Sequence, residues 1–368
     1  MKFVFAGGGT GGHVVPALAV AREAAGRGHD VTFIGTREGI EAKLVPEAGF
    51  PIEWIEIGGM KRVGWKKLMQ SLWQLPASVT RCVRILDRER PAAVFSMGGY
   101  VAGPAVLGAV WRRIPVVAME PNAMPGFVHR MMARWIERAL LGMEDAARFF
   151  PEGRSEVTGV PVREPFFAAQ GSGSSVFTVL ITGGSQGSRT LNRAFRESWP
   201  LFAAQGPAVR FLHQAGAAEA DVLREDFART GLAGSVTAFI ADMPAAFAEA
   251  RLVVGRAGAG AVAELAAAGK PSILVPFPHA ADDHQTANAR AMEQAGAALC
   301  VADGEFTGAR LHREVAALAG DAARLARMGG AAKRLARPGA AARAVTALEQ
   351  ACKTVPFPVD TERESRNN

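Results

Sequence analysis

The chain has 368 residues, of which 49% are hydrophobic and 21% charged, and its formal net charge is +7. This length exceeds the size at which one hydrophobic core usually stops growing, so two domains are expected. The three cysteines lie far apart and form no CxxC pair, which argues against a disulfide framework or a zinc site and fits a reducing cytosol. The N-terminal residues do not have the pattern of a signal peptide.

The first predicted element is a buried strand over residues 2–6, followed by the glycine-rich segment GGGTGGH (residues 7–13) and a predicted helix. Gly7, Gly9 and Gly12 match GxGxxG, which usually indicates a dinucleotide at a helix N-terminus. The acidic residue expected after the second strand is displaced, because VTFI (residues 31–34) is followed by GTRE. This pattern alone therefore does not establish a dinucleotide site.

A histidine ends the glycine-rich segment, where dinucleotide sites usually carry only glycine and small apolar residues. At the start of a helix, His13 faces the positive end of the helix dipole, which favours the neutral imidazole and therefore a proton acceptor near pH 7. The alternative is a histidine that only caps or packs against the helix.

The first half of the chain contains one strongly basic segment. Residues 60–90 carry 8 Lys and Arg against 2 Asp and Glu, whereas the whole chain up to residue 163 has 21 against 15. Tryptophan and leucine beside cations are typical of a helix at an anionic membrane surface, and a core-packed helix with a solvated basic edge is the alternative. The predicted membrane-facing residues are Lys61, Arg62, Trp65, Lys66, Lys67, Leu72, Trp73 and Trp111.

Residues 91–111 contain no charge and approach the roughly 20 residues that cross a bilayer. Gly98-Gly99 and Gly103-Pro104 divide this run, which predicts a buried strand, a loop and the start of a buried helix. We expect no membrane-spanning segment.

Strand-like apolar runs alternate with helical patterns along the whole chain, which indicates parallel sheets covered by helices on both faces. After the first half, the strand and glycine-rich turn recur in FTVLITGGSQGS (residues 177–188). We therefore predict two doubly wound domains facing each other across a cleft. The predicted division is a first domain (1–163), a linker (164–175), a second domain (176–335), a C-terminal helix packing back on the first domain (336–353) and a disordered tail (354–368).

The second half contains further candidate ligand contacts. TGGSQGS (residues 182–188) places backbone N–H groups and the Ser185 hydroxyl at a helix N-terminus, where anions bind. In GRAGAGAVAEL (residues 255–265), Glu264 can accept two hydrogen bonds from a ribose diol, although an exposed helix glutamate is the commoner case. Arg163 is a candidate diphosphate clamp, with a solvated linker arginine as the alternative.

HAADDHQTANA (residues 279–289) contains two histidines and two aspartates. Their spacing matches neither HExxH nor a calcium-binding loop, and aspartates also favour a helix N-terminus. We predict no metal site in the chain.

Seven stretches, GGGTGGH, SMGGYVAGP, EPNAMPG, GVPVR, TGGSQGS, RAGAGAVAEL and DDHQTANA, occur in the order found in MurG-type transferases. The chain resembles this family over about residues 1–350. The resemblance implies the GT-B fold, with two Rossmann-like domains. It implies an inverting glycosyltransferase that moves N-acetylglucosamine (GlcNAc) from UDP-GlcNAc to the N-acetylmuramic acid (MurNAc) 4-hydroxyl of lipid I, an undecaprenyl-linked acceptor. The product is lipid II, for peptidoglycan synthesis.

The resemblance also implies roles for individual residues. His13 is the expected general base, and Thr10, Gly11 and Gly12 are expected to line the cleft beside either the donor diphosphate or the acceptor. Asn122 is expected to touch the sugar, Arg163 and Ser185 the phosphates, and Glu264 the ribose. The remaining donor contacts implied are the Ile240 backbone with uracil, His284 and Gln285 with the GlcNAc hydroxyls, and Ala259. The chain departs from common family patterns at three positions: Pro121, where glutamine is common, Val160, where asparagine is common, and Ala261, where threonine is usual.

The resemblance implies a peripheral enzyme at the cytoplasmic face of the bacterial plasma (inner) membrane, bound to its anionic surface. No tightly bound cofactor is expected, since UDP-GlcNAc is a substrate, and a divalent-cation requirement stays open, as do protein partners in wall synthesis. The competing hypotheses are a related enzyme with another acceptor, such as diacylglycerol, and a dinucleotide-dependent oxidoreductase. We do not expect nucleic-acid binding, because the basic segment lacks an RNA-binding aromatic motif.

Overall fold

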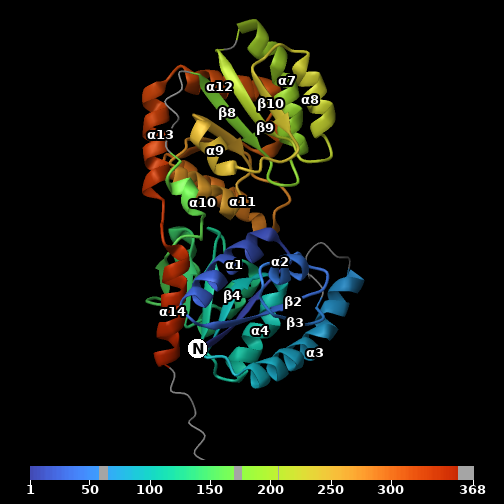
Figure 1. Cartoon of the computed structure of the whole chain (residues 1–368), viewed down its shortest axis with the longest axis vertical. Coiled ribbons are helices and arrows are strands. Elements are labelled where there is room, and N and C mark those ends of the chain that lie inside the picture. Colours follow the sequence, from blue (N-terminus) through green and yellow to red (C-terminus); the bar gives the residue numbers. More distant parts are fainter. Residues whose placement is uncertain (58–64, 170–175, 206, 355–368) are drawn as a thin grey trace, which may run out of the picture.

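The computed structural model describes residues 1–57, 65–169, 176–205 and 207–354, without the side chains of residues 65–73, 205 and 354. Two lobes follow one another along the long axis of the molecule (Figure 1). The lower lobe holds the first half of the chain, and the upper lobe holds most of the second half.

The N-terminal domain is built on a parallel sheet that has seven strands within the described residues, in the order β3-β2-β1-β4-β5-β6-β7. Its strands are β1 (Lys2–Gly7), β2 (Asp30–Gly35), β3 (Ile52–Trp54), β4 (Ala93–Gly98), β5 (Val116–Glu120), β6 (Arg138–Leu141) and β7 (Ser155–Val157). Its helices are α1 (Gly11–Gly26), α2 (Glu41–Glu47), α3 (Trp65–Glu89), α4 (Gly99–Trp111) and α5 (Phe127–Met132), followed by the short 3₁₀ turns η1 (Ala133–Trp135) and η2 (Glu144–Phe149).

The C-terminal domain repeats this plan with a six-stranded parallel sheet among the described residues, in the order β10-β9-β8-β11-β12-β13. Its strands are β8 (Phe177–Thr182), β9 (Val209–Gln214), β10 (Gly234–Thr237), β11 (Leu252–Gly255), β12 (Ser272–Leu274) and β13 (Ala298–Cys300). Its helices are α6 (Glu164–Phe167), α7 (Arg189–Gln205), α8 (Ala220–Ala228), α9 (Met243–Glu249), α10 (Ala259–Ala268), α11 (His284–Gln294), α12 (Gly308–Ala319) and α13 (Ala322–Arg334), with the 3₁₀ turns η3 (Ala281–Asp283) and η4 (Asp303–Glu305).

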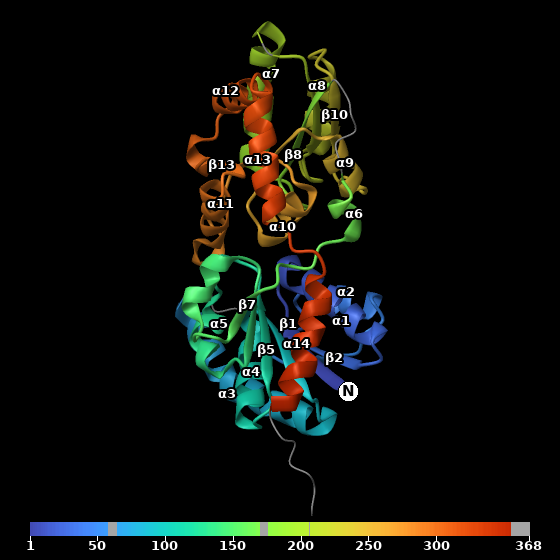
Figure 2. The ribbon, with the colours of Figure 1, turned by 90° about the vertical axis from the view of Figure 1, so that its left-hand side faces the viewer.

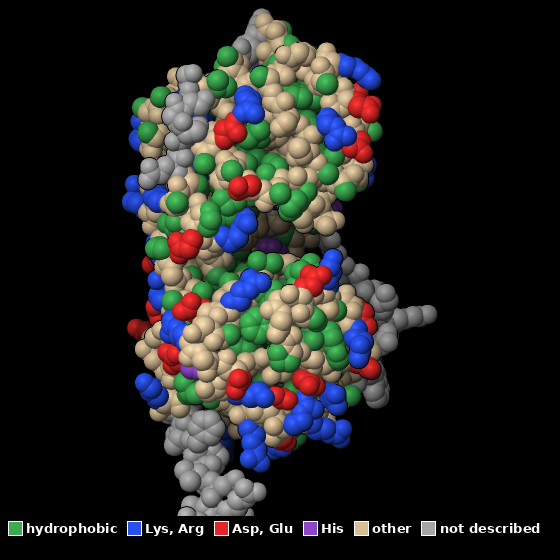
Figure 3. Space-filling model, in the orientation of Figure 1, with side chains coloured by type: hydrophobic (Ala, Val, Ile, Leu, Met, Phe, Trp, Pro, Cys, Tyr) green, Lys and Arg blue, Asp and Glu red, His purple; other side chains and the backbone are tan. Residues whose placement is uncertain are grey.

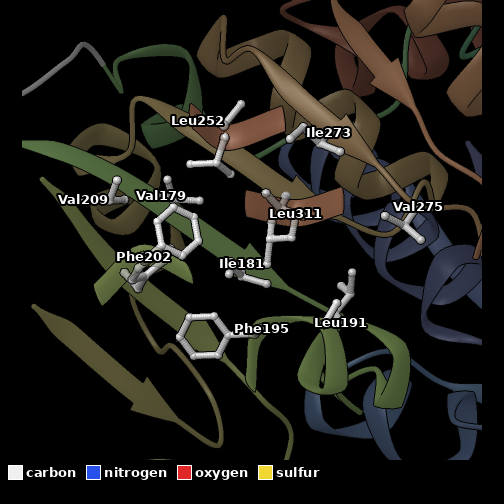
Figure 4. Close-up of a cluster of buried hydrophobic side chains, with 14 of the residues drawn as sticks. Val179, Ile181, Leu191, Phe195, Phe202, Val209, Leu252, Ile273, Val275 and Leu311 are labelled. Atoms are coloured by element: carbon white, nitrogen blue, oxygen red, sulfur yellow. The ribbon is translucent and has the colours of Figure 1, made fainter. Parts of the chain in front are cut away.

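Each sheet is buried on both faces because its central strands are continuous apolar runs. In β1, Phe3 and Phe5 point into one core, and Val4 points into the core on the opposite face. The C-terminal domain has the same two-sided arrangement. Figure 4 shows Val179 and Ile181 of β8 facing Phe195 of α7.

The predicted fold class of two doubly wound parallel-sheet domains is confirmed. Three strands were not predicted, β3, β7 and β13, each of three residues at a sheet edge. β3 and β7 are partly exposed and each contains a glutamate, so neither shows a continuous apolar run. β13 does lie in an apolar stretch, residues 297–302, but this stretch was not identified as a strand. The predicted loop inside residues 91–111 was also wrong, since α4 begins directly at Gly99 and includes Pro104. The chain turns there at Gly98 and Gly99, both with a φ of +77°.

The last helix, α14 (Ala340–Thr354), leaves the C-terminal domain and packs along the N-terminal one (Figure 2). Ala344, Val345 and Leu348 enter the same core as Phe3 and Phe5. Hydrogen bonds at its edge add to this packing: Arg27 donates to the Ala342 carbonyl at 3.0 Å, and the His29 ring lies 2.9 Å from Glu349. The chain therefore crosses between the domains twice.

None of the helices formed by the described residues combines the length and apolar character needed to cross a bilayer.

The packing of α14 predicts a stability effect. Leu348 is fully buried, so Leu348→Ala should lower the free energy of unfolding by about 2–5 kcal/mol, measured by urea denaturation. Leu201→Ala, on the half-exposed face of α7, serves as the control and should change it by less than about 1 kcal/mol. An equal loss of unfolding free energy in the two variants would mean that the buried face of α14 contributes no more to stability than an exposed helix face does.

Candidate active site

The two glycine-rich turns lie on opposite sides of one cleft. They follow β1 and β8, and in parallel sheets the loops at the carboxyl ends of the strands form the binding crevice. Figure 3 shows the hollow between the lobes, with a histidine side chain exposed inside it.

The main cavity, with a volume of about 970 Å³, lies on the C-terminal side of the cleft. Of the predicted site residues it is lined by Arg163, Ser185, Ile240, Glu264 and Gln285. The other predicted residues do not line it. Ala259 borders a smaller cavity of about 220 Å³ between the domains, and the remaining ones, Thr10, Gly11, Gly12, His13, Asn122 and His284, belong to segments around the cleft.

The first glycine-rich turn is held by a buried carboxylate that the sequence did not single out. Glu41, at the start of α2 and 0% exposed, accepts hydrogen bonds from the Gly9 backbone N–H at 2.8 Å and from the Thr36 hydroxyl at 2.8 Å. Gly9 has a φ of +84°, and a Cβ there would lie 2.7 Å from the Tyr100 ring. The turn therefore requires glycine for both its conformation and its close packing.

His13 is fixed in one tautomer by this turn. Its Nδ1 lies 3.2 Å from the Gly8 carbonyl oxygen and 3.3 Å from the Thr10 hydroxyl. Because a carbonyl can only accept, Nδ1 carries the proton and Nε2 holds the available lone pair. Burial lowers the pKa of His13 below its usual 6.5, so the ring is neutral at pH 7 and can accept a proton. Desolvation is the largest cause of this shift, whereas the sequence interpretation relied on the helix dipole.

A second buried network lies behind the cleft on the N-terminal side. His129 is 2.9 Å from the Glu120 carboxylate through Nδ1 and 3.1 Å from the Ser96 hydroxyl through Nε2. Burial alone would raise the pKa of Glu120, but hydrogen bonds from His129 and from the backbone of Asn122 and Gly126 outweigh it and lower the pKa. Glu120 is therefore a carboxylate at the end of β5.

The same carboxylate orients Asn122. Glu120 Oε1 accepts from the Asn122 backbone N–H at 3.0 Å and from its side-chain Nδ2 at 3.1 Å. Asn122 Oδ1 accepts in turn from Asn288 across the cleft, at 3.1 Å. Both ends of the Asn122 amide thus have partners in the protein.

On the C-terminal side, Gln214 at the end of β9 links two predicted segments. It donates to the Gly184 carbonyl at 2.8 Å and accepts from the Ile240 backbone N–H at 2.8 Å. The glycine-rich turn and the loop carrying Ile240 are thereby fixed to each other. Gln214 was not predicted, because its role depends on contacts 26 to 30 residues away.

Glu264 lies in α10 and lines the main cavity. Burial raises the pKa of its carboxyl group to about 7, and the nearby Arg163 guanidinium opposes this only in part. A buried carboxyl with few protein partners, facing a cavity, is the type of group that a ligand hydroxyl satisfies.

The segment before α11 has a strained backbone. Asp282 and Asp283 both have left-handed conformations, with φ values of +52° and +51°, which cost about 1–3 kcal/mol each in non-glycine residues. Asp282 forms a 3.5 Å ion pair with Arg130 of the other domain. The following Gln285 accepts hydrogen bonds from the backbone N–H groups of Ala257 and Phe277 at 3.2 and 3.0 Å. Such strain is concentrated at functional sites.

Among the described residues, no group of three or more His, Cys, Asp or Glu side chains is arranged to hold a metal ion.

The fold and the position of the cleft define the class of protein to which this chain belongs. Two doubly wound domains, each with a glycine-rich turn at one cleft, form the GT-B fold of glycosyltransferases. The glycosyltransferase family 28 N-terminal domain matches residues 3–141, and the family's C-terminal domain matches residues 178–344. The chain belongs to glycosyltransferase family 28, which confirms the family resemblance of the sequence motifs.

Individual relatives are similar over nearly the whole chain. A protein of Solibacter usitatus is 56% identical over 88% of this chain and 90% of its own length. A protein of Myxococcus xanthus is 40% identical over 88% of this chain and 86% of its own length. Both are named UDP-N-acetylglucosamine–N-acetylmuramyl-(pentapeptide) pyrophosphoryl-undecaprenol N-acetylglucosamine transferase. The crystal structure of Acinetobacter baumannii MurG has a TM-score of 0.81 and 30% identity, covering 95% of this chain and 99% of that one.

Proposed function

We propose that this chain transfers GlcNAc from UDP-GlcNAc to the MurNAc 4-hydroxyl of lipid I and thereby forms lipid II for peptidoglycan synthesis. The observation that carries the proposal is the position of a neutral His13 at the cleft that also contains the anion-binding turn and Glu264. The names of the relatives, at up to 56% identity, support this substrate pair.

The donor occupies the cavity of the C-terminal domain. Its diphosphate lies against Arg163 and Ser185, where the N–H groups before α7 face the anion. Glu264 accepts the ribose hydroxyls. The Ile240 N–H already donates to Gln214, so its backbone carbonyl is the group that remains to recognise uracil.

The sugar lies toward the domain boundary, with Gln285 and His284 at the start of α11 beside its hydroxyls. Asn122 approaches it from the other side. Thr10, Gly11 and Gly12 lie at the same end of α1 as His13, next to the acceptor, and Ala259 begins the helix that carries Glu264.

The reaction is one direct displacement. His13 Nε2 takes the proton of the 4-hydroxyl as that oxygen bonds to the anomeric carbon, the bond from this carbon to the diphosphate breaks, and the configuration inverts. The departing UDP takes the bonding electrons, and Arg163 with the helix N-termini stabilises the charge that develops. No covalent enzyme intermediate forms, and no tightly bound cofactor takes part.

Replacing the base tests the reaction. His13→Ala should lower acceptor-dependent UDP release by about 10²–10⁴-fold, the usual contribution of a general base, while the UDP dissociation constant stays nearly unchanged. Arg22→Ala, on the exposed face of the same helix, is the control. Turnover within a few-fold of wild type would exclude His13 as the base. No release by wild type with a lipid I analogue would point to another acceptor.

The raised pKa of Glu264 predicts a pH dependence of donor binding. Below about pH 7 the carboxyl group is protonated in the free protein, and the ribose diol prefers the carboxylate. UDP affinity should therefore fall as the pH is lowered through 7, by up to tenfold per unit. Calorimetric titration with UDP at pH values from 5.5 to 8.5 measures this change in affinity.

Glu264→Gln is the control for this measurement, since UDP itself titrates near pH 6. The variant should bind UDP more weakly and retain only the pH dependence of the nucleotide. Identical pH profiles for the two proteins would mean that Glu264 does not hold the ribose.

The enzyme is proposed to bind peripherally to the anionic cytoplasmic face of the plasma membrane, where its lipid-linked acceptor resides. The predicted residues Lys61 and Arg62, and the side chains of Trp65, Lys66, Lys67, Leu72 and Trp73, lie outside the described part of the structure. Trp111, at the end of α4, is 70% exposed. Figure 3 shows Lys and Arg side chains gathered at the lower end of the same lobe.

The position of Trp111 indicates how this membrane-binding surface lies relative to α3. Arg112 bonds to Asp87 at 2.6 Å, so Trp111 lies near the C-terminal end of α3. Asp87 follows Trp73 by 14 residues of this helix, or about 20 Å at 1.5 Å per residue. A membrane that contacts both tryptophans therefore runs along the length of α3.

Vesicle binding tests this attachment. Simultaneous replacement of Trp65, Lys66, Lys67 and Trp73 by alanine should abolish co-sedimentation with vesicles rich in phosphatidylglycerol. Wild-type binding should weaken with added salt. Arg224→Ala/Arg327→Ala, on the exposed surface of the other domain, should bind as wild type does. Unchanged binding of the fourfold variant would contradict the proposal.

A further inference from the structure

One buried side chain bonds to both domains at the base of the cleft. Asn288, on α11 and 0% exposed, accepts from the Ala123 backbone N–H through Oδ1 at 2.9 Å. Its Nδ2 donates to the Asn122 side-chain oxygen at 3.1 Å and to the Ala257 carbonyl at 3.0 Å. The first two partners belong to the N-terminal domain and the third to the C-terminal domain.

These partners leave only one orientation of the amide. The Ala123 N–H can only donate, and the Ala257 carbonyl can only accept, so a flipped amide would place like groups against each other. Both Nδ2 hydrogens of Asn288 are then used. The same bonds define the Asn122 amide, whose oxygen faces Asn288 and whose Nδ2 faces Glu120.

The bonds on either side of Asn288 continue into both domains. On the N-terminal side they continue through Asn122 to Glu120 and His129, at the end of β5. On the C-terminal side, the Ala257 backbone N–H donates to Gln285. One hydrogen-bonded line therefore runs from the acceptor domain to the sugar end of the donor cavity.

We propose that Asn288 is a positioning residue for the transfer: it sets the separation and orientation of the two domains and the direction of the Asn122 amide, without touching either substrate. The catalytic part of this inference rests on the proposed function. The reacting oxygen belongs to a substrate held by one domain and the anomeric carbon to a substrate held by the other. A displacement of 1 Å between them is enough to slow a reaction by about 10²-fold.

Other interdomain contacts do not replace this one. Arg130 and Asp282 are partly exposed and 3.5 Å apart, and exposed ion pairs of this kind hold geometry weakly. Asn288 is buried, and loss of its side chain leaves the Ala123 N–H without this acceptor.

Two substitutions separate positioning from support of the fold. Asn288→Ala removes all three bonds. Asn288→Asp keeps the volume and the acceptor for Ala123 but sets an oxygen against the Asn122 oxygen and the Ala257 carbonyl. Ser198→Ala is the control, since it also removes a buried hydrogen bond, 2.7 Å to the Phe195 carbonyl, but inside one domain.

The expected result is a split between binding and turnover. Both Asn288 variants should lower kcat for acceptor-dependent UDP release at least tenfold, with the calorimetric UDP dissociation constant within threefold of wild type. Small-angle scattering should show a broader range of domain orientations in both variants and the wild-type profile in Ser198→Ala. If Asn288→Ala is not recovered folded, Asn288→Asp carries the test.

Two results would overturn the proposal: kcat within threefold of wild type, or scattering profiles that coincide with wild type. An enzyme that releases no UDP with any lipid I analogue would instead contradict the proposed function. The scattering comparison would still decide whether Asn288 holds the domains together.

Discussion

Parallel strand pairing is the constraint on which the site depends. Every strand pairing among the residues that the structure describes is parallel. The carboxyl ends of these strands therefore lie on one edge of each sheet, and both edges border the cleft. His13 follows β1, Asn122 follows β5, and the second glycine-rich turn follows β8. The chemistry is therefore carried by loops and by the helices that begin in them, and rigid strands set the positions of both.

Three glutamates near the cleft, of which Glu41 and Glu120 are fully buried and Glu264 is partly buried, show how the protein distributes hydrogen-bond donors. Glu41 accepts hydrogen bonds from the Gly9 N–H of the first glycine-rich turn and from the N–H and hydroxyl groups of Thr36. Glu120 accepts hydrogen bonds from His129 and from the backbone around Asn122, which lower its pKa. Glu264 accepts no hydrogen bond from the residues that the structure describes, and burial raises its pKa to about 7. Glu264, the carboxyl group without donors, is the one that faces the large cavity. Its free acceptor atoms are therefore available to bind a ligand, whereas those of Glu41 and Glu120 support the protein structure.

The long central strands, the two glycine-rich turns and the family could be predicted from the sequence, because each depends on residues close together in the chain. Glu41, His129 and Asn288 could not. Asn288 meets Asn122 from 166 residues away, and Glu41 meets Gly9 from 32 residues away, so no local pattern indicates either pair. The cause of the neutral state of His13 was also hidden, since desolvation depends on the packing around the ring and not on the position of the residue in its helix.

The return of α14 to the first domain has a consequence for biosynthesis. The core that contains Phe3 and Phe5 is completed by Val345 and Leu348, which leave the ribosome after the strands β1 to β13. Until then, the N-terminal half displays an uncovered apolar face beside α1. Nascent chains stalled before residue 340 should therefore hold a first domain that is still open to chaperones and proteases, although its strands have all been made.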